Sequence, residues 1–152
     1  MKSFWRCFVC NDIHYGVKPP GVCPTCGVAR PFVRVSAREA RAVQGWGPGE
    51  GQASVGPSDA GEFSPEEFRR SIEAFAAGQE FEVNRDRARV DLLLEGLFGN
   101  AANHGLKYCP CRLRTKEFQE DLKLVCPCFF TAHETYRGID AGECWCGLFK
   151  KR

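Results

Sequence analysis

The chain has 152 residues and a net charge of +2, so its basic and acidic side chains nearly balance. This balance argues against nucleic acid as the main partner, and no stretch has the roughly 18 consecutive apolar residues that a membrane span needs. The first residues contain no apolar signal core, so we expect a cytoplasmic protein. A chain of this length can form one ordinary domain or two small ones.

Ten cysteines are the most informative feature of the sequence. They form two C-x2-C pairs near the N-terminus and three C-x-C pairs near the C-terminus, and no cysteine lies outside a pair. Because disulfides are rare in the cytosol, a cysteine-rich chain of this kind is expected to bind metal or to carry out redox chemistry. The five pairs are Cys7/Cys10, Cys23/Cys26, Cys109/Cys111, Cys126/Cys128 and Cys144/Cys146.

Residues 1–35 have few helix signals and too little apolar side chain to fold without a cross-link such as a metal ion. The two C-x2-C pairs in this segment bring four thiolates to one tetrahedral centre. We therefore predict that one metal ion binds there, to Cys7, Cys10, Cys23 and Cys26. A tetrahedral site made only of sulfur suits both zinc and iron.

Residues 36–62 are rich in Gly, Ala and Ser, which predicts a flexible linker before a C-terminal domain at residues 63–152. That domain should open with a helix capped by Ser64, Pro65 and Glu67 and closed by Gly78. Its apolar stripe is Phe68, Ile72, Phe75 and Ala76. A second helix is expected over residues 86–98, ending at Gly99. A third is expected over residues 115–124, with Phe118 and Leu122 facing inward.

The six C-terminal cysteines exceed the four thiolates that a cubane iron–sulfur cluster requires. The two remaining thiols could form a disulfide that the cluster reduces. A Cys-Pro-Cys unit is stiff, and neighbouring side chains of an extended segment point in different directions. One sulfur of such a pair can therefore face a cluster while the other faces outward. The spacing also differs from the ferredoxin pattern, which makes a simple electron carrier less favoured.

The N-terminal segment resembles the rubredoxin-like domain of rubrerythrins. The similarity lies in Phe4-Trp5-Arg6-Cys7-Phe8-Val9-Cys10, Tyr15-Gly16, Pro19-Pro20 and Cys23-Pro24-Thr25-Cys26-Gly27. It implies a short β-rich domain that holds a single iron cycling by one electron. The sequence departs from the family pattern at Asn11, where glycine is usual. A zinc ribbon with a structural metal is the alternative.

The three C-x-C pairs, with Cys-Pro-Cys occurring twice and Leu148-Phe149 following the last pair, resemble the catalytic chain of ferredoxin–thioredoxin reductase over about residues 64–149. The resemblance implies a mostly α-helical catalytic domain wrapped around a [4Fe–4S] cluster. By position it assigns the cluster ligands to Cys109, Cys126, Cys128 and Cys144. It assigns the active disulfide to Cys111, the outward nucleophile, and Cys146, the inner thiol that bonds to the cluster in the one-electron intermediate.

The function that this resemblance implies is ferredoxin-dependent disulfide reduction. The cluster would pass two single electrons to the Cys111–Cys146 disulfide, which would reduce a thioredoxin-like protein by thiol–disulfide exchange. The iron of the rubredoxin-like domain could relay electrons, and nothing in the sequence corresponds to a separate variable chain. Two alternatives remain, a non-catalytic iron–sulfur electron carrier and a zinc protein with two structural sites. The C-x-C spacing disfavours the second, because zinc sites prefer C-x2–4-C.

Three further features concern the surroundings of the cluster. Trp145 stands where the family usually has histidine, and we expect it to pack over the cluster. His133 and His104 are candidate proton donors, although an exposed loop position is the favoured interpretation of each. Basic residues near the first pair could dock an acidic ferredoxin and lower the pKa of Cys111, or could form a solvated face. They are Lys107, Arg112, Arg114 and Lys116.

Overall fold

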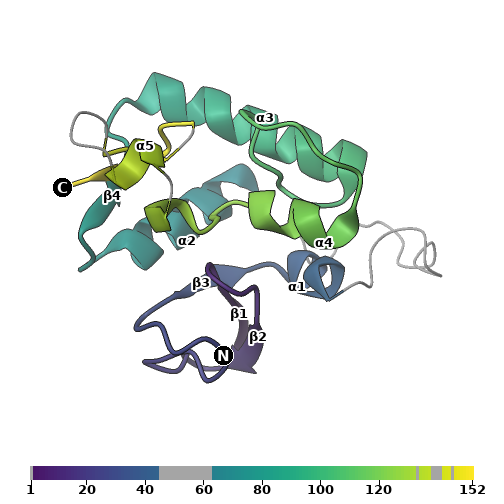
Figure 1. The fold of residues 1–152 in the computed structure, drawn as a ribbon, viewed down its shortest axis with the longest axis vertical. Helices are drawn as coiled ribbons and strands as arrows, with labels where there is room; N and C mark the ends of the chain where they lie inside the picture. Colours follow the sequence, from purple (N-terminus) through teal and green to yellow (C-terminus); the bar gives the residue numbers. More distant parts are fainter. Residues whose placement is uncertain (1, 45–62, 133, 138–141, 145) are drawn as a thin grey trace. The chain divides into compact units, whose positions relative to one another are not determined.

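The computed structural model describes residues 2–44, 63–132, 134–137, 142–144 and 146–152 (Figure 1). The chain divides into two units, Met1–Ser71 and Ile72–Arg152, and each is described by itself. The predictions for His133 and Trp145 lie outside the described residues. Among the residues that are described, no helix has both the length and the apolar character needed to cross a membrane.

The N-terminal unit is built on a three-stranded antiparallel sheet in the order β2-β1-β3. The strands are β1 (Ser3–Cys7), β2 (Ile13–Gly16) and β3 (Phe32–Val35). Aromatic and β-branched residues favour these strands, and β1 lies in the centre, where Trp5 pairs with His14 on one side and Arg34 on the other. The predicted β-rich N-terminus is confirmed.

Helix α1 (Ala37–Val43) follows β3 directly and begins at Ser36, whose side chain accepts a hydrogen bond from the Glu39 N–H (3.0 Å). The linker prediction is therefore wrong at its start, because residues 37–43 are helical and bury Ala40 and Val43. Two alanines of this segment, which suggest flexibility in the sequence, are buried small residues of a packed helix. Residues 45–62 of the predicted linker lie outside the described residues.

Helix α2 (Pro65–Ala76) begins as the sequence predicts. The Glu67 N–H donates to Ser64 Oγ (3.1 Å) and the Ser64 N–H donates to Glu67 Oε1 (3.3 Å), which is the reciprocal pattern of a capping box. Its predicted apolar stripe is buried, and Gly78 follows with a φ of 77° that ends the helix. Start, stripe and end are all confirmed.

Helix α3 (Arg87–His104) is longer than predicted, because it continues through Gly99 and ends at Gly105. Its predicted core residues are buried, namely Val90, Leu93, Leu94 and Leu97. One glycine in a helix interior costs only about 1 kcal/mol, and the added turn buries Ala101. The φ of 92° at Gly105 provides the left-handed position at which the helix stops.

Short elements make up the rest of the C-terminal unit. They are β4 (Phe81–Val83), α4 (Phe118–Asp121), the 3-10 turns Leu122–Leu124 and Phe130–Ala132, α5 (Glu134–Arg137) and β5 (Phe149–Lys151). The predicted third helix thus starts three residues later than expected and tightens into a 3-10 turn. Leu122 is buried as predicted, whereas Phe118 is 39% exposed and does not face inward.

Aromatic rings form the core next to the C-terminal cysteines. Phe130 and Phe149 stack at a centroid distance of 4.7 Å with their planes 2° apart. Phe81 packs edge-on against both rings, while β4 and β5 pair antiparallel with Val83 opposite Phe149. This cluster fixes β5 and the residues just before it, which include the third cysteine pair.

The capping box of α2 gives a direct test of this local structure. Ser64→Ala removes the acceptor for the Glu67 N–H and should destabilise the first turn by about 1 kcal/mol. Amide hydrogen exchange at Glu67 and Phe68 should then be about fivefold faster. Ser64→Asp keeps a capping oxygen and should exchange like the wild type. Equal exchange in all three proteins would contradict the role of the cap.

Candidate functional site

The four N-terminal cysteines form one compact group. Their Sγ atoms all lie within 4.8 Å of one another, with Cys7 and Cys26 3.7 Å apart and Cys10 and Cys23 also 3.7 Å apart. Cys7 and Cys23 are buried, whereas Cys26 is exposed at the surface. The predicted four-cysteine group is confirmed, and its donor set suits a single tetrahedral metal ion.

Both C-x2-C turns of this group have the same backbone geometry. The Asn11 N–H donates to the Cys7 carbonyl and the Gly27 N–H donates to the Cys23 carbonyl, each at 2.9 Å. Both residues are left-handed, with φ of 66° at Asn11 and 80° at Gly27. Asparagine enters this region more readily than most residues, so Asn11 fills the position where the family has glycine.

The ionisation of these thiols reflects their different surroundings. Burial raises the pKa of Cys7 and of Cys10. Burial also acts to raise the pKa of Cys23, but the backbone N–H groups of Cys26 and Thr25 outweigh it and lower the value. A metal ion binds thiolates and must displace the protons that remain.

Five of the six C-terminal cysteines line a single cavity. Its walls are Cys109, Cys126, Cys128, Cys144, Cys146, Phe130 and Phe149. Cys111 is not among the lining residues and is exposed. The first pair therefore has one sulfur at the cavity and the other at the surface, as expected of a stiff Cys-Pro-Cys unit.

Backbone hydrogen bonds hold the first two pairs side by side. The Cys109 N–H donates to the Leu124 carbonyl (2.7 Å) and the Cys126 N–H donates to the Lys107 carbonyl (3.0 Å). These two bonds enclose an antiparallel bridge between Tyr108 and Val125. The loops that carry the cysteines are thus fixed to each other although they belong to no regular sheet.

The third pair lies in a tight turn that closes on β5. The Cys144 N–H donates to the Phe149 carbonyl (3.0 Å), and the Phe149 N–H donates back to Cys144 Sγ (3.3 Å). Gly147 completes the turn with a φ of 80° and donates to the Cys144 carbonyl (2.9 Å). The Sγ atoms of Cys144 and Cys146 are 3.7 Å apart.

Two residues that the sequence did not point to anchor this turn. Arg89 of α3 donates to the Cys146 carbonyl from Nη2 (2.9 Å) and Nε (3.3 Å). Asn84 donates its side-chain amide to the Gly147 carbonyl (2.8 Å). The φ of 80° favours glycine at position 147, and a Cβ there would stand 2.9 Å from Arg89 Nε, so the Arg89 side chain would have to shift. No local sequence motif predicts a role for Arg89 or Asn84, because each donates a hydrogen bond to a carbonyl about 60 residues later in the chain.

Buried thiols that contact one another hold their protons firmly. The hydrogen bond with Cys146 and burial raise the pKa of Cys144. The hydrogen bond with Cys109, together with burial, raises the pKa of Cys146 to about 12, against an opposing effect of Cys144. Separately, the lining of the cavity is all sulfur apart from two phenylalanine rings, and this donor set is the kind that a [4Fe–4S] cluster takes.

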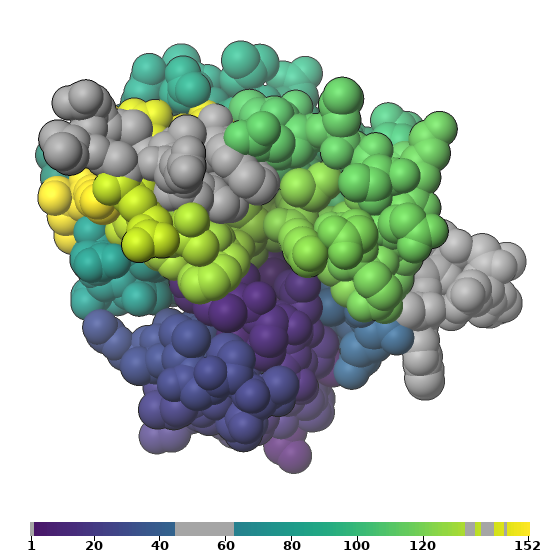
Figure 2. All heavy atoms as spheres, in the orientation of Figure 1, coloured from purple at the N-terminus to yellow at the C-terminus, as the bar shows by residue number. Residues whose placement is uncertain are grey.

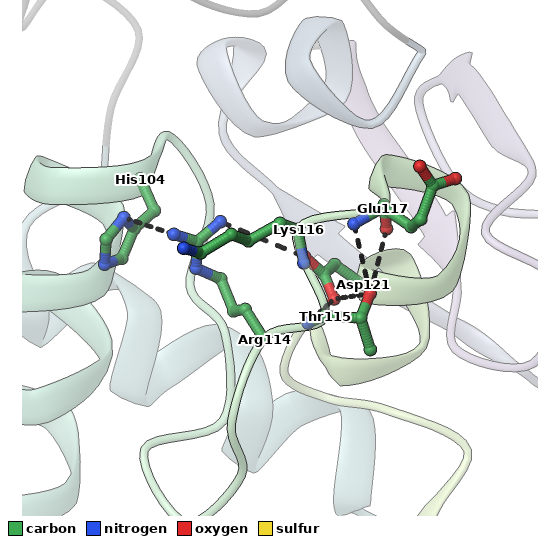
Figure 3. Close-up of polar contacts among 6 residues, drawn as sticks. All are labelled: His104, Arg114, Thr115, Lys116, Glu117 and Asp121. Carbon is green, nitrogen blue, oxygen red and sulfur yellow. Dashed lines mark hydrogen bonds and ion pairs between the residues drawn. The ribbon is translucent and has the colours of Figure 1, made fainter.

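The segment after Cys111 is organised by one buried carboxylate, Asp121 (Figure 3). Its Oδ1 accepts from the Thr115 N–H (2.7 Å) and hydroxyl (2.8 Å), and its Oδ2 accepts from the Lys116 N–H (3.0 Å). Arg114 Nη1 lies 3.9 Å from Oδ2, and Arg114 Nη2 donates to His104 Nδ1 (2.9 Å). Lys116 has a φ of 76°, so these bonds hold a backbone conformation that lysine rarely adopts.

The predicted basic residues near Cys111 differ in their surroundings. Lys107 is only 2% exposed and lies over the Phe98 ring, so its prediction as a surface residue is wrong. Arg114 is engaged with Asp121, and its partner His104 is exposed, as favoured for that histidine. Arg112 and Lys116 are exposed. Leu113, which lies between Arg112 and Lys116 in the sequence, is 93% exposed. The chain that follows α3 is drawn in green on the surface shown in Figure 2.

Family models match both segments that carry the cysteine pairs. Residues 59–152 match the family model of the ferredoxin thioredoxin reductase catalytic beta chain. The chain belongs to this family. Residues 5–32 match the rubredoxin-like domain of rubrerythrin. The catalytic-chain family is one of disulfide oxidoreductases, and its match takes in all three C-x-C pairs. No significant match to a curated protein is found.

The Asp121 contacts predict how the loop after Cys111 responds to acid. Burial alone would raise the pKa of this carboxyl, but hydrogen bonds from Thr115 and Lys116, with Arg114 nearby, lower it below the ordinary 3.8. A depressed pKa adds stability above the unfolded value of about 3.9, which is lost as the pH falls through the folded value. Exchange protection of the Thr115 and Lys116 amides should therefore fall below about pH 4.

Asp121→Asn should remove this pH dependence and cost about 1–3 kcal/mol, because its one oxygen can still serve Thr115 while the Lys116 N–H loses its acceptor. Glu120→Gln is the matched control, since Glu120 makes only a surface pair with Lys123 and should change stability by less than about 1 kcal/mol. Hydrogen exchange across pH 3–6 measures both effects. An unaltered acid response in Asp121→Asn would contradict the assignment.

Proposed function

We propose that the chain is a ferredoxin-dependent disulfide reductase, with a metal domain at residues 1–35 and a catalytic domain at residues 63–152. One observation carries this proposal. Five thiols surround one cavity while Cys111, the partner of Cys109 in a stiff Cys-Pro-Cys unit, is exposed. We assign Cys109, Cys126, Cys128 and Cys144 as ligands of a [4Fe–4S] cluster. This division follows the resemblance to the ferredoxin thioredoxin reductase catalytic chain, which also implies that Cys111 and Cys146 are the redox-active pair.

The different burial of the two redox thiols supports different roles for them. Cys111 is open to a macromolecular substrate, so its thiolate attacks one sulfur of the substrate disulfide. That disulfide bond breaks, and the second substrate sulfur leaves and takes a proton. Cys146, which is buried, then attacks the Cys111 sulfur of the mixed disulfide. The reduced substrate is released and the Cys111–Cys146 disulfide is formed.

Regeneration of the two thiols requires two electrons and two protons. When bound, a [4Fe–4S] cluster supplies electrons singly beside the disulfide, which suits a one-electron donor such as ferredoxin. A plant-type ferredoxin near −400 mV and a thioredoxin near −270 mV differ by about 130 mV. For two electrons this is roughly 6 kcal/mol in favour of reduction. We therefore assign ferredoxin as the donor and a thioredoxin-like disulfide as the acceptor.

The N-terminal domain is proposed to hold a single iron, in keeping with its similarity to the rubredoxin-like domain. Its exposed Cys26 gives that ion a ligand at the protein surface, where an external redox partner can approach. A zinc ion at the same four thiols would make the domain structural. Free thiols in a working cycle need a reducing compartment, so we place the protein in the cytoplasm.

The metal content of anaerobically purified protein tests the cofactor assignment. We expect about five irons and four acid-labile sulfides per chain, from one cubane and one mononuclear iron. About four irons with one zinc would keep the reductase and make the N-terminal metal structural. Zinc without sulfide would contradict the proposed function.

Replacement of the two redox thiols separates catalysis from electron carriage. Cys111→Ser should lose reduction of an oxidised thioredoxin because the attacking sulfur is gone, while its iron and sulfide content should remain that of the wild type. Cys146→Ser should accumulate a mixed disulfide through Cys111, visible by mass spectrometry without reductant. A Cys111→Ser protein that reduces thioredoxin at the normal rate would contradict the role of Cys111. A wild-type protein that passes electrons but reduces no disulfide would favour a non-catalytic electron carrier.

A further inference from the structure

The N-terminal unit contains a fully buried charge next to its metal-binding group. Arg6 lies in β1 immediately before Cys7, and its relative exposure is 0%. Its Nε donates to Glu39 Oε2 (3.0 Å) and its Nη1 donates to Asn11 Oδ1 (2.9 Å). A charge taken out of water is costly unless its partners are well placed, so both contacts constrain the segments that carry those partners.

The contact with Asn11 connects this charge to the first C-x2-C turn. Asn11 follows Cys10 directly and occupies the left-handed conformation that turns the backbone around the metal group. Glycine reaches this conformation without cost. Asparagine adds a side-chain oxygen, and here that oxygen contacts Arg6. The residue that departs from the family pattern is thus the one that joins the turn to the buried charge.

The contact with Glu39 connects the same charge to helix α1. Glu39 lies in the first turn of α1, is buried, and donates its own N–H to Ser36 Oγ. An isolated helix of seven residues is unstable in water, so α1 depends on its tertiary contacts. The ion pair with Arg6 is one polar contact among them, and Ala40, Ala42 and Val43 are buried apolar residues of the helix.

We propose that Arg6 is a positioning residue that couples helix α1 to the metal site through Asn11 and Glu39. Metal bound by the four cysteines orders the turn that ends at Asn11 and so favours the docked position of α1. By linkage, docked α1 strengthens metal binding by the same factor. The segment after β3 is then part of the metal site's support, although the similarity to the rubredoxin-like domain ends at residue 32. This inference is independent of the C-terminal chemistry.

The coupling is tested first in the unaltered full chain. Hydrogen exchange of the Ala40 and Gln44 amides, which donate within α1, is measured with one equivalent of Co²⁺ bound and after its removal by a chelator. The expected result is at least tenfold faster exchange in the metal-free protein, the lower limit expected when an outer-shell contact is coupled to metal binding. Equal exchange in both states would overturn the proposal, and this outcome requires no variant to fold.

The second test measures the cobalt affinity of variants. Each protein competes with a chelator for Co²⁺, and the thiolate-to-cobalt absorption reports how much Co²⁺ is bound. Arg6→Lys keeps the charge but lacks the guanidinium fork, and Glu39→Gln keeps the shape but lacks the charge. Each should weaken cobalt binding about 10–100-fold. The double variant should be no worse than either single variant, because one contact carries both effects. Asn11→Gly should also weaken binding, although it relieves the backbone.

Arg38→Gln in the same helix is the matched control and should bind cobalt within about twofold of the wild type. The contribution of the six C-terminal thiols is measured in a Cys7→Ser/Cys26→Ser background and subtracted. Cobalt affinity in Glu39→Gln equal to that of Arg38→Gln, or strictly additive losses in the double variant, would overturn the proposal.

Discussion

Phe149 is the residue on which the C-terminal unit most depends. Its backbone exchanges hydrogen bonds with Cys144, through the Cys144 N–H and through the Cys144 sulfur. Its strand pairs with β4, and its ring stacks on Phe130 and forms one wall of the thiol cavity. A single residue thus joins the hydrophobic core, the small sheet and the last cysteine pair. The turn that carries Cys144 and Cys146 is held in place because it leads directly into this residue.

The N-terminal unit reaches order by a different route. One apolar cluster of this unit centres on Cys7, Cys23 and Phe32, and a domain this small needs more than hydrophobic burial to fold. The sheet, the two C-x2-C turns and the buried ion pair of Arg6 and Glu39 make up the difference. In this unit two of the four cysteines, Cys7 and Cys23, are themselves core residues, so a metal ion bound there would add to the stability of the same cluster. In the C-terminal unit the aromatic core stands beside the thiols, and the two contributions are separable.

The sequence was most informative where the determining contacts are local. The start of α2 depends on Ser64 and Glu67, three residues apart, and the four-thiol group depends on two C-x2-C pairs whose spacing constrains the geometry. Prediction failed where distant partners decide. Helix α1 looked like linker because Glu39 finds its partner 33 residues earlier, at Arg6. Arg89 escaped notice because it acts on a carbonyl 57 residues away. Gly99 does not end α3, because a single glycine costs only about 1 kcal/mol in a helix and the helix continues to the left-handed Gly105.

The exposure of Cys111 affects how the protein withstands oxidants such as peroxide. Its sulfur is the one among the six C-terminal cysteines that lies at the surface outside the cavity, so peroxide in solution reaches it first. A free thiolate there can be carried to sulfinic acid, which most cells cannot reverse. In the proposed disulfide with Cys146 the same sulfur is capped and can be recovered by two electrons. The resting, oxidised protein is then the form that withstands an oxidative burst.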